Sequence, residues 1–151
     1  MLGMIGYMIG CFVAAGVATV IVSLFRPIKK HDNLLSWRVF IALYVFFILA
    51  PYGYAEVMTR MYGETMVEAV DEIFHYECPN GKLTYYKVIY CKGDKARVIA
   101  VGRERSKWGG METPVMAINM ERTNGQWESV EFNWVTSDER GHDSISLPPY
   151  W

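Results

Sequence analysis

The sequence lacks charge over two long stretches near its start. None of its 15 Lys and Arg and none of its 16 Asp and Glu lies in residues 1–25 or 39–55. A helix crosses a bilayer with about 20 mostly apolar residues, and hydrocarbon accepts helices because it offers the backbone no other hydrogen-bond partners. A chain this small could not cover two uncharged helices as a soluble core. The pattern therefore predicts a transmembrane α-helical hairpin, made of two transmembrane helices, over residues 1–60.

Basic residues are missing before the first apolar run, where a cleaved signal peptide would carry them. They follow the run instead, since residues 26–38 hold Arg26, Lys29, Lys30 and Arg38 against the single acid Asp32. We therefore interpret the first run as a retained helix. The positive-inside rule places loop 26–38 in the cytoplasm and both termini outside, and a bacterial inner membrane fits this arrangement. The two lysines suit contact with anionic lipid.

Strong charge and catalytic motifs are absent as well. The formal net charge of −1 gives no indication of nucleic-acid binding. No G-x-S-x-G or C-x-x-C-H motif occurs, and the adjacent His142, Asp143 and Ser144 do not have the geometry of a catalytic triad. We expect no enzyme activity, no cofactor and no small-molecule substrate.

Cysteine is scarce, and only Cys78 and Cys91 lie outside the hairpin. An oxidising compartment favours a disulfide between them. An extended strand between the two would instead separate them by about 30 Å, and a disulfide needs Cα atoms about 4.4–6.8 Å apart. The sequence therefore leaves open whether Cys78 and Cys91 form a disulfide. His75 and His142 would complete a Cys2His2 zinc set, but its spacing is poor and the same separation applies, so no metal site is predicted.

Methionine could indicate copper, in the sets Met58, Met61 and Met66 or Met116 and Met120. Met116 and Met120 fall on the apolar face of a predicted strand, where filling of the core explains them. We predict no copper site.

Residues 61–151 are predicted to form a small extracytoplasmic α+β domain with an irregular C-terminal tail. The apolar spacing over residues 64–74 is typical of one amphipathic helix. Period-two patterns predict strands at 82–91, 95–105, 114–122 and 126–136, with an Asn-Gly turn before the last. The fold class is then one helix on a four-stranded antiparallel β-meander. Its apolar face is predicted to contain Tyr86, Val88, Tyr90, Val98, Ala100, Met116, Ile118, Met120, Val130, Phe132 and Trp134, and the opposite face to be polar with some apolar members such as Ile99 and Val101.

Two surfaces suit binding. Small residues at steps of four form a helix-packing interface on the first helix, either for the second helix of the hairpin or for a partner's helix: Gly6, Gly10, Ala14 and Ala18. Trp108 precedes two glycines in the loop 106–113, where it either anchors a contact or folds back onto the sheet edge. Tyr150 and Trp151 dock on the domain, a partner or the membrane. Trp108, Tyr150 and Trp151 together form the predicted outer-domain interface.

The turns Lys92-Gly93-Asp94-Lys95 and Asn124-Gly125-Gln126-Trp127 lie in a meander that follows a membrane anchor and a helix. In this respect residues 92–135 resemble the small anchored domains of the cytochrome oxidase assembly factor and Tim21-like group. Two membrane helices replace the usual one, and the glycine-rich strand entry of that group is not matched.

These patterns predict a non-catalytic accessory subunit of a larger integral-membrane complex, of the respiratory or photosynthetic type. Other integral-membrane subunits and the lipid bilayer are its expected partners. The alternative is a membrane-anchored assembly or binding factor that acts transiently on a client membrane protein.

Overall fold

A computed structural model describes residues 2–25 and 33–141 of the chain. The chain divides into two compact units, Met1–Gly53 and Tyr54–Trp151.

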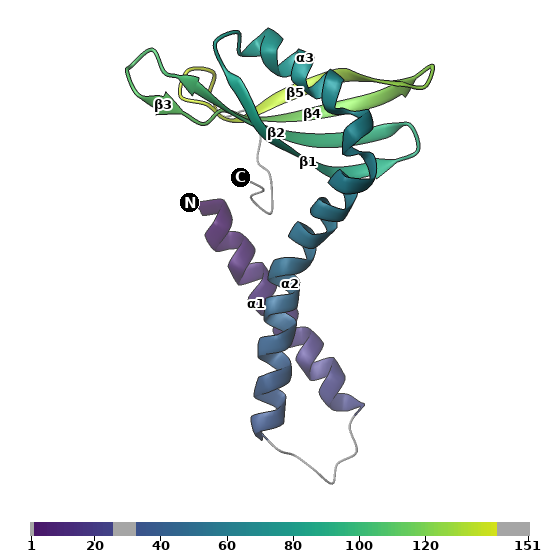
Figure 1. Ribbon diagram of the computed structural model, residues 1–151. Helices are drawn as coiled ribbons and strands as arrows, with labels where there is room; N and C mark the ends of the chain where they lie inside the picture. The colour runs from purple at the N-terminus through teal and green to yellow at the C-terminus, as the bar shows by residue number, and fades with distance from the viewer. Residues whose placement is uncertain (1, 26–32, 142–151) are drawn as a thin grey trace. The chain divides into compact units, whose positions relative to one another are not determined.

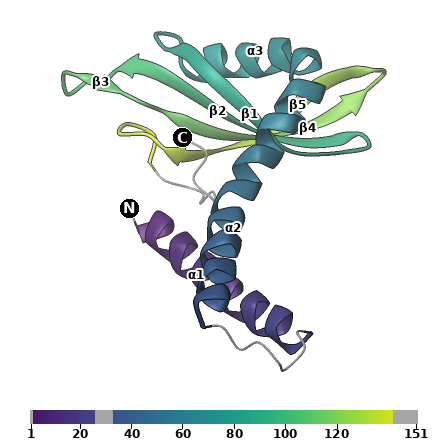
Figure 2. The same ribbon diagram turned by 60° about the horizontal axis from the view of Figure 1, so that its bottom comes forward.

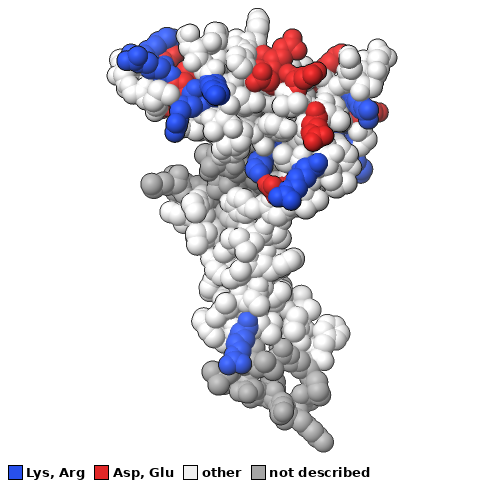
Figure 3. Space-filling model, in the orientation of Figure 1, with Lys and Arg blue, Asp and Glu red and all other residues white. Residues whose placement is uncertain are grey.

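The first unit is built from two helices, α1 (Leu2–Leu24) and most of α2 (Asn33–Tyr62) (Figure 1). Both are long and apolar enough to cross a membrane. The visible surface of the hairpin is almost free of charged side chains (Figure 3). The prediction of a loop reaching residue 38 is wrong, because α2 already begins at Asn33; the rest of that loop, 26–32, lies outside the described residues.

The two helices of the hairpin pack through a narrow strip. On α1, Cys11 and Ala15 are buried, and the ring of Phe12 meets that of Phe40 edge-on at 5.1 Å between centroids. The Tyr7 hydroxyl lies 2.9 Å from the carbonyl oxygen of Phe47 and donates to it. Small side chains on α1 thus let the helices approach, and a tyrosine adds a polar contact where α2 contains a proline.

The second unit begins with the last turns of α2, followed by a short 3-10 helix, η1 (Gly63–Thr65), and α3 (Val67–Glu77). The helix predicted at 64–74 therefore exists, although its first residues form η1 and it continues to Glu77. Val70 and Phe74 are buried on one side of α3. Its acidic residues point outward and contribute to the acidic patch visible in Figure 3.

A five-stranded antiparallel sheet carries α3 on one face (Figures 1 and 2). The four long strands are β1 (Lys82–Lys92), β2 (Lys95–Arg105), β4 (Val115–Thr123) and β5 (Gln126–Thr136), in the order β1-β2-β4-β5. This confirms the predicted antiparallel sheet. The two-residue strand β3 (Met111–Glu112) was not predicted; it pairs with the end of β2 within what was expected to be a loop.

The main core lies between α3 and the sheet. Most of the predicted apolar face is in it, with six fully or almost fully buried members: Val88, Val98, Ala100, Met116, Ile118 and Met120. The prediction is wrong for Tyr90 and Val130, which are 45% and 61% exposed. Both stand at shifts of strand register, between Val88 and Tyr90 in β1 and opposite the Asn119–Met120 step in β5. A β-bulge inserts one residue, so the alternation of faces is reset there.

The opposite face of the sheet holds a second apolar cluster, formed by Ile99, Val101, Val115, Ala117 and Val135. Each of these side chains is at most 6% exposed. The sequence pattern predicted a polar face with scattered apolar residues, so this burial was underestimated.

The end of α2 is bonded to β1 within the second unit. The hydroxyl of Thr59 accepts a hydrogen bond from the backbone N–H of Val88 at 2.9 Å. Glu56 forms an ion pair with Lys87 and a second one with Arg60, at 3.1 Å from Nε. These contacts join helix and sheet although 29 residues separate Thr59 from Val88 in the chain.

Candidate functional site

The tip of the β2–β3 hairpin presents Trp108 to solvent. Its side chain is 87% exposed, so it does not fold back onto the sheet edge. The turn is closed by the N–H of Ser106, which donates to the carbonyl of Gly110 at 3.2 Å, and by the N–H of Gly109, which donates to the carbonyl of Ser106 at 3.1 Å. Gly109 and Gly110 have φ of 83° and 112°, which favours glycine at both positions. The turn therefore holds a large aromatic in a defined place.

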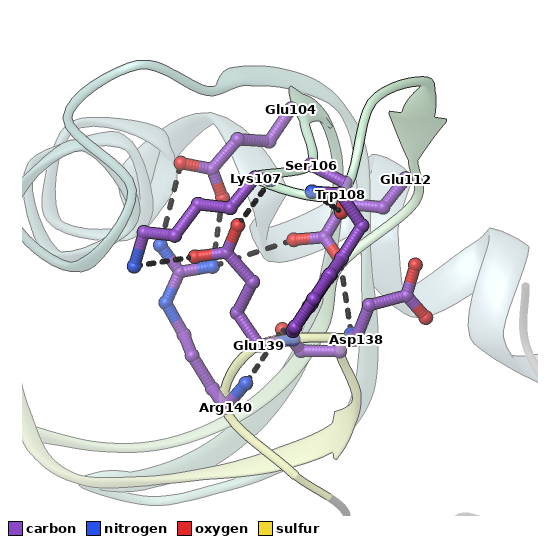
Figure 4. A network of polar contacts seen from close by, with 9 residues as sticks. Glu104, Ser106, Lys107, Trp108, Glu112, Asp138, Glu139 and Arg140 are labelled. Atoms are coloured by element: carbon purple, nitrogen blue, oxygen red, sulfur yellow. Dashed lines mark hydrogen bonds and ion pairs between the residues drawn. The ribbon is translucent and has the colours of Figure 1, made fainter.

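Glu139 lies in the turn that follows β5 and binds Lys107 of this hairpin (Figure 4). Its carboxylate accepts a hydrogen bond from the backbone N–H of Lys107 at 2.7 Å and forms an ion pair with the Lys107 ammonium at 2.9 Å. These two contacts hold the pKa of the Glu139 carboxyl below its ordinary value, the side-chain contact contributing most. Lys107, next to Trp108, is thus tied by both its backbone and its side chain.

Beneath the hairpin, Arg140 pairs with two buried glutamates (Figure 4). Its guanidinium contacts Glu104 in a bidentate arrangement, at 2.7 and 3.3 Å, and lies 3.6 Å from Glu112. The second oxygen of Glu112 accepts the N–H of Asp138 at 2.9 Å. Each glutamate is only 6% exposed. A buried carboxylate is tolerated where it is paired and hydrogen-bonded, so the three side chains depend on one another.

This cluster also contacts the core. The Arg140 guanidinium lies 4.9 Å from the centroid of the Trp134 ring, a cation–π contact. Cys78, at the end of α3, is fully buried beside it, and burial raises the pKa of its thiol from 9.0 to about 11. A thiol with such a pKa is mostly protonated and therefore a poor nucleophile. The arrangement supports positioning of the Trp108 turn rather than covalent chemistry.

The sequence analysis missed Glu104, Glu112 and Arg140. One signal was present, because alternation along β2 places Glu104 on the same face as Val98 and Ala100, where a charge requires a partner. Glu112 and Arg140 carried no comparable signal, since they lie in segments predicted as loop and tail.

The predicted cysteine and histidine residues do not come together. Cys78 and Cys91 are both unbonded thiols, and β1 runs without interruption through most of the sequence between them. His75 lies on the exposed side of α3, where its Nδ1 is 3.3 Å from the Asp71 carboxylate. His142 lies outside the described residues. Within residues 2–25 and 33–141, no three His, Cys, Asp or Glu side chains are grouped to hold a metal ion.

The small residues of α1 fall partly outside the contact with α2. Gly6, Gly10 and Ala14 are exposed, and Ala18 is half-buried. A Cβ built on Gly6 or Gly10 meets no atom within 4 Å. The contact with α2 uses the neighbouring row, which contains Cys11 and Ala15. Tyr150 and Trp151, the other predicted interface residues, lie outside the described residues.

No protein family, curated protein or solved structure matches this chain. Its function is therefore argued from its own geometry.

Proposed function

We propose that this protein is a non-catalytic accessory subunit of a larger integral-membrane complex, of the respiratory or photosynthetic type. The observation that carries the proposal is the row Gly6, Gly10 and Ala14 on α1, which stays exposed beside the buried contact with α2. In a membrane, helices associate by close van der Waals packing, and small residues allow backbones to approach. This row suits the helix of a partner subunit.

In this proposal α1 and α2 span the bilayer. The basic residues that follow α1 lie on the cytoplasmic side, and the α+β unit lies on the other side. The support is the uncharged length of both helices and the four basic residues between positions 26 and 38.

The Trp108 turn is the proposed contact of the outer unit. Trp108 is 87% exposed and Met111, on the same hairpin, is 64% exposed. Aromatic side chains held in a fixed position are frequent anchors of protein interfaces, because little conformational entropy is lost when they bind. The contacts of Glu139 and Arg140 supply such a fixed position.

Replacement of Gly10 by Leu tests the helix contact. A Cβ at this position meets no atom within 4 Å, so we expect the protein to fold and insert while losing its partner subunits. Gently solubilised membranes, native electrophoresis and mass spectrometry give the readout. Val13→Leu is the control, because Val13 is also exposed on α1 but is not part of the small-residue row. A wild-type protein that migrates as a lone chain would contradict the proposal.

The alternative is an assembly or binding factor that engages a client transiently, and the exposure of Trp108 on a fixed turn favours it equally. A photo-crosslinking residue at position 108 separates the two. A subunit gives one partner in fixed stoichiometry, and a factor gives several partners or a partner present only during assembly.

A further inference from the structure

A row of four polar residues crosses the sheet on the face opposite α3. Tyr90 of β1 is the register partner of Arg97 on β2. Arg97 is in turn paired with Asn119 on β4, and Asn119 is paired with Glu131 on β5. Register partners on adjacent strands project from the same face. The β1 irregularity between Val88 and Tyr90 gives Tyr90 this position.

A hollow of about 590 Å³ lies over this row. Small-molecule sites in proteins are typically of about 300–1,000 Å³ and combine apolar walls with a few polar groups. Here the apolar surface comes from Ile89 and Val130. Val130 is 61% exposed, which leaves its side chain available to a ligand.

Arg97 lines this hollow and has a side-chain nitrogen that lacks a hydrogen-bond partner. Its Nε is buried and has no hydrogen-bond partner among the described residues. Four other polar side chains of the hollow are paired: the Asn119 amide donates to Glu131 at 3.1 Å, and Lys95 pairs with Glu121 at 3.0 Å. A buried donor without a partner costs about 1–3 kcal/mol, so an acceptor placed there would be favoured.

We propose that this hollow binds a carboxylate carried on an apolar or aromatic body. A guanidinium offers Nε–H and Nη–H side by side, a spacing that matches the two oxygens of a carboxylate. Ile89, Val130 and the ring of Tyr90 contact the body of the ligand. A dianion such as phosphate is disfavoured, because Glu121 and Glu131 line the same hollow and repel added negative charge.

Two sources carry this chemistry. One is a free aromatic or aliphatic acid. The other is the C-terminal carboxylate of a polypeptide.

The probe is N-acetyl-tryptophan, compared with its uncharged amide, and titrated by NMR or calorimetry into the full chain in detergent. The amide accounts for partitioning into micelles. We expect the acid to bind at least tenfold more tightly. Arg97→Lys keeps the charge but loses the paired donors and should weaken binding about tenfold, and Arg97→Gln should abolish it. Glu131→Gln removes a repelling charge and should strengthen binding. Arg103→Gln, a β2 cation that does not line the hollow, should change it less than twofold.

A second arm compares N-acetyl-tryptophan with an acetylated peptide that ends in a free tryptophan carboxylate. Tighter binding of the small acid indicates a free ligand, and tighter binding of the peptide indicates a polypeptide C-terminus. Equal binding of acid and amide, no effect of Arg97→Lys, or no binding of either probe overturns the proposal.

Discussion

The hydroxyl of Tyr7 on α1 donates a hydrogen bond to the carbonyl of Phe47 on α2, 2.9 Å away. Phe47 is the residue four positions before Pro51, which lies inside α2. Proline has no N–H, so the carbonyl of Phe47 has no intrahelical partner of the usual kind. Tyr7 supplies the missing donor from the neighbouring helix.

A double-mutant cycle tests this relationship. Tyr7→Phe should destabilise the hairpin by about 0.5–1.5 kcal/mol, because it removes the donor. In a Pro51→Ala background the introduced alanine supplies its own N–H, so Tyr7→Phe should then have almost no effect. Unfolding in a denaturing detergent is the measurement. Equal effects of Tyr7→Phe in both backgrounds would show that the hydroxyl does not compensate for the proline.

Phe74 of α3 packs directly against Gly102 of β2. A Cβ on Gly102 would stand 1.9 Å from Cζ of Phe74. Gly102→Ala should therefore destabilise the outer unit by about 1–3 kcal/mol, as overpacking of a core does. Phe74→Leu in the same protein should recover part of that loss. Chemical denaturation of the single and double variants checks this, and an alanine tolerated without loss would contradict the close contact.

Arg140 compensates two buried carboxylates. Arg140→Gln should cost about 3–5 kcal/mol, because Glu104 and Glu112 would remain buried without a cation. Lys107→Gln is the comparison, since that ion pair is formed by a side chain that is 83% exposed and should contribute less than about 1 kcal/mol. Hydrogen exchange should also show faster exchange in residues 106–112 of Arg140→Gln. Comparable stability of the two variants would argue against the role given to Arg140.

The Cys78 thiol predicts a dependence of stability on alkaline pH. Its pKa is raised from 9.0 in the unfolded chain to about 11 in the folded protein, chiefly by burial. The folded state therefore holds its proton more tightly, and this contribution is complete below pH 9 and is lost as the pH rises towards 11. The loss is on the order of 2 kcal/mol. Denaturation at several pH values should show a smaller dependence in Cys78→Ala than in wild type; part of it should remain, because burial also raises the pKa values of Tyr85, Tyr86 and Cys91. Cys91→Ala is the control, since it keeps Cys78 and should retain most of the dependence.

The elements of the fold could be predicted from the sequence because each carries a clear period. Residues 64–74 repeat at the helical spacing, and the strand segments alternate, so the helix and the four long strands were found. The face of a residue was predicted only as far as the alternation holds. The register shifts at Tyr90 and Val130 break it, and they depend on pairing with a neighbouring strand, which no local pattern encodes. β3 is missed for the same reason, because two residues have no period of their own.

The candidate site was predicted less completely than the fold. Trp108 could be found, since a large aromatic beside two glycines marks an exposed turn. The residues that support that turn could not be found, because Glu104, Glu112 and Arg140 come together only when three distant segments meet. Alternation along β2 puts Arg97 on the face that was predicted to be polar, yet nothing in the sequence indicates that its Nε is buried.

The bonds between α2 and β1 also limit how this protein can self-associate. β1 is an outer strand of the sheet, and such a strand offers unpaired backbone groups to any other extended chain. The hydroxyl of Thr59 accepts a hydrogen bond from the backbone N–H of Val88, and Glu56 forms an ion pair with the neighbouring Lys87. A soluble fragment that starts at Tyr54 keeps this protection, whereas one that starts at Gly63 leaves β1 open to edge-to-edge aggregation. The last turns of α2 therefore protect the second unit from aggregation and also connect it to the first unit.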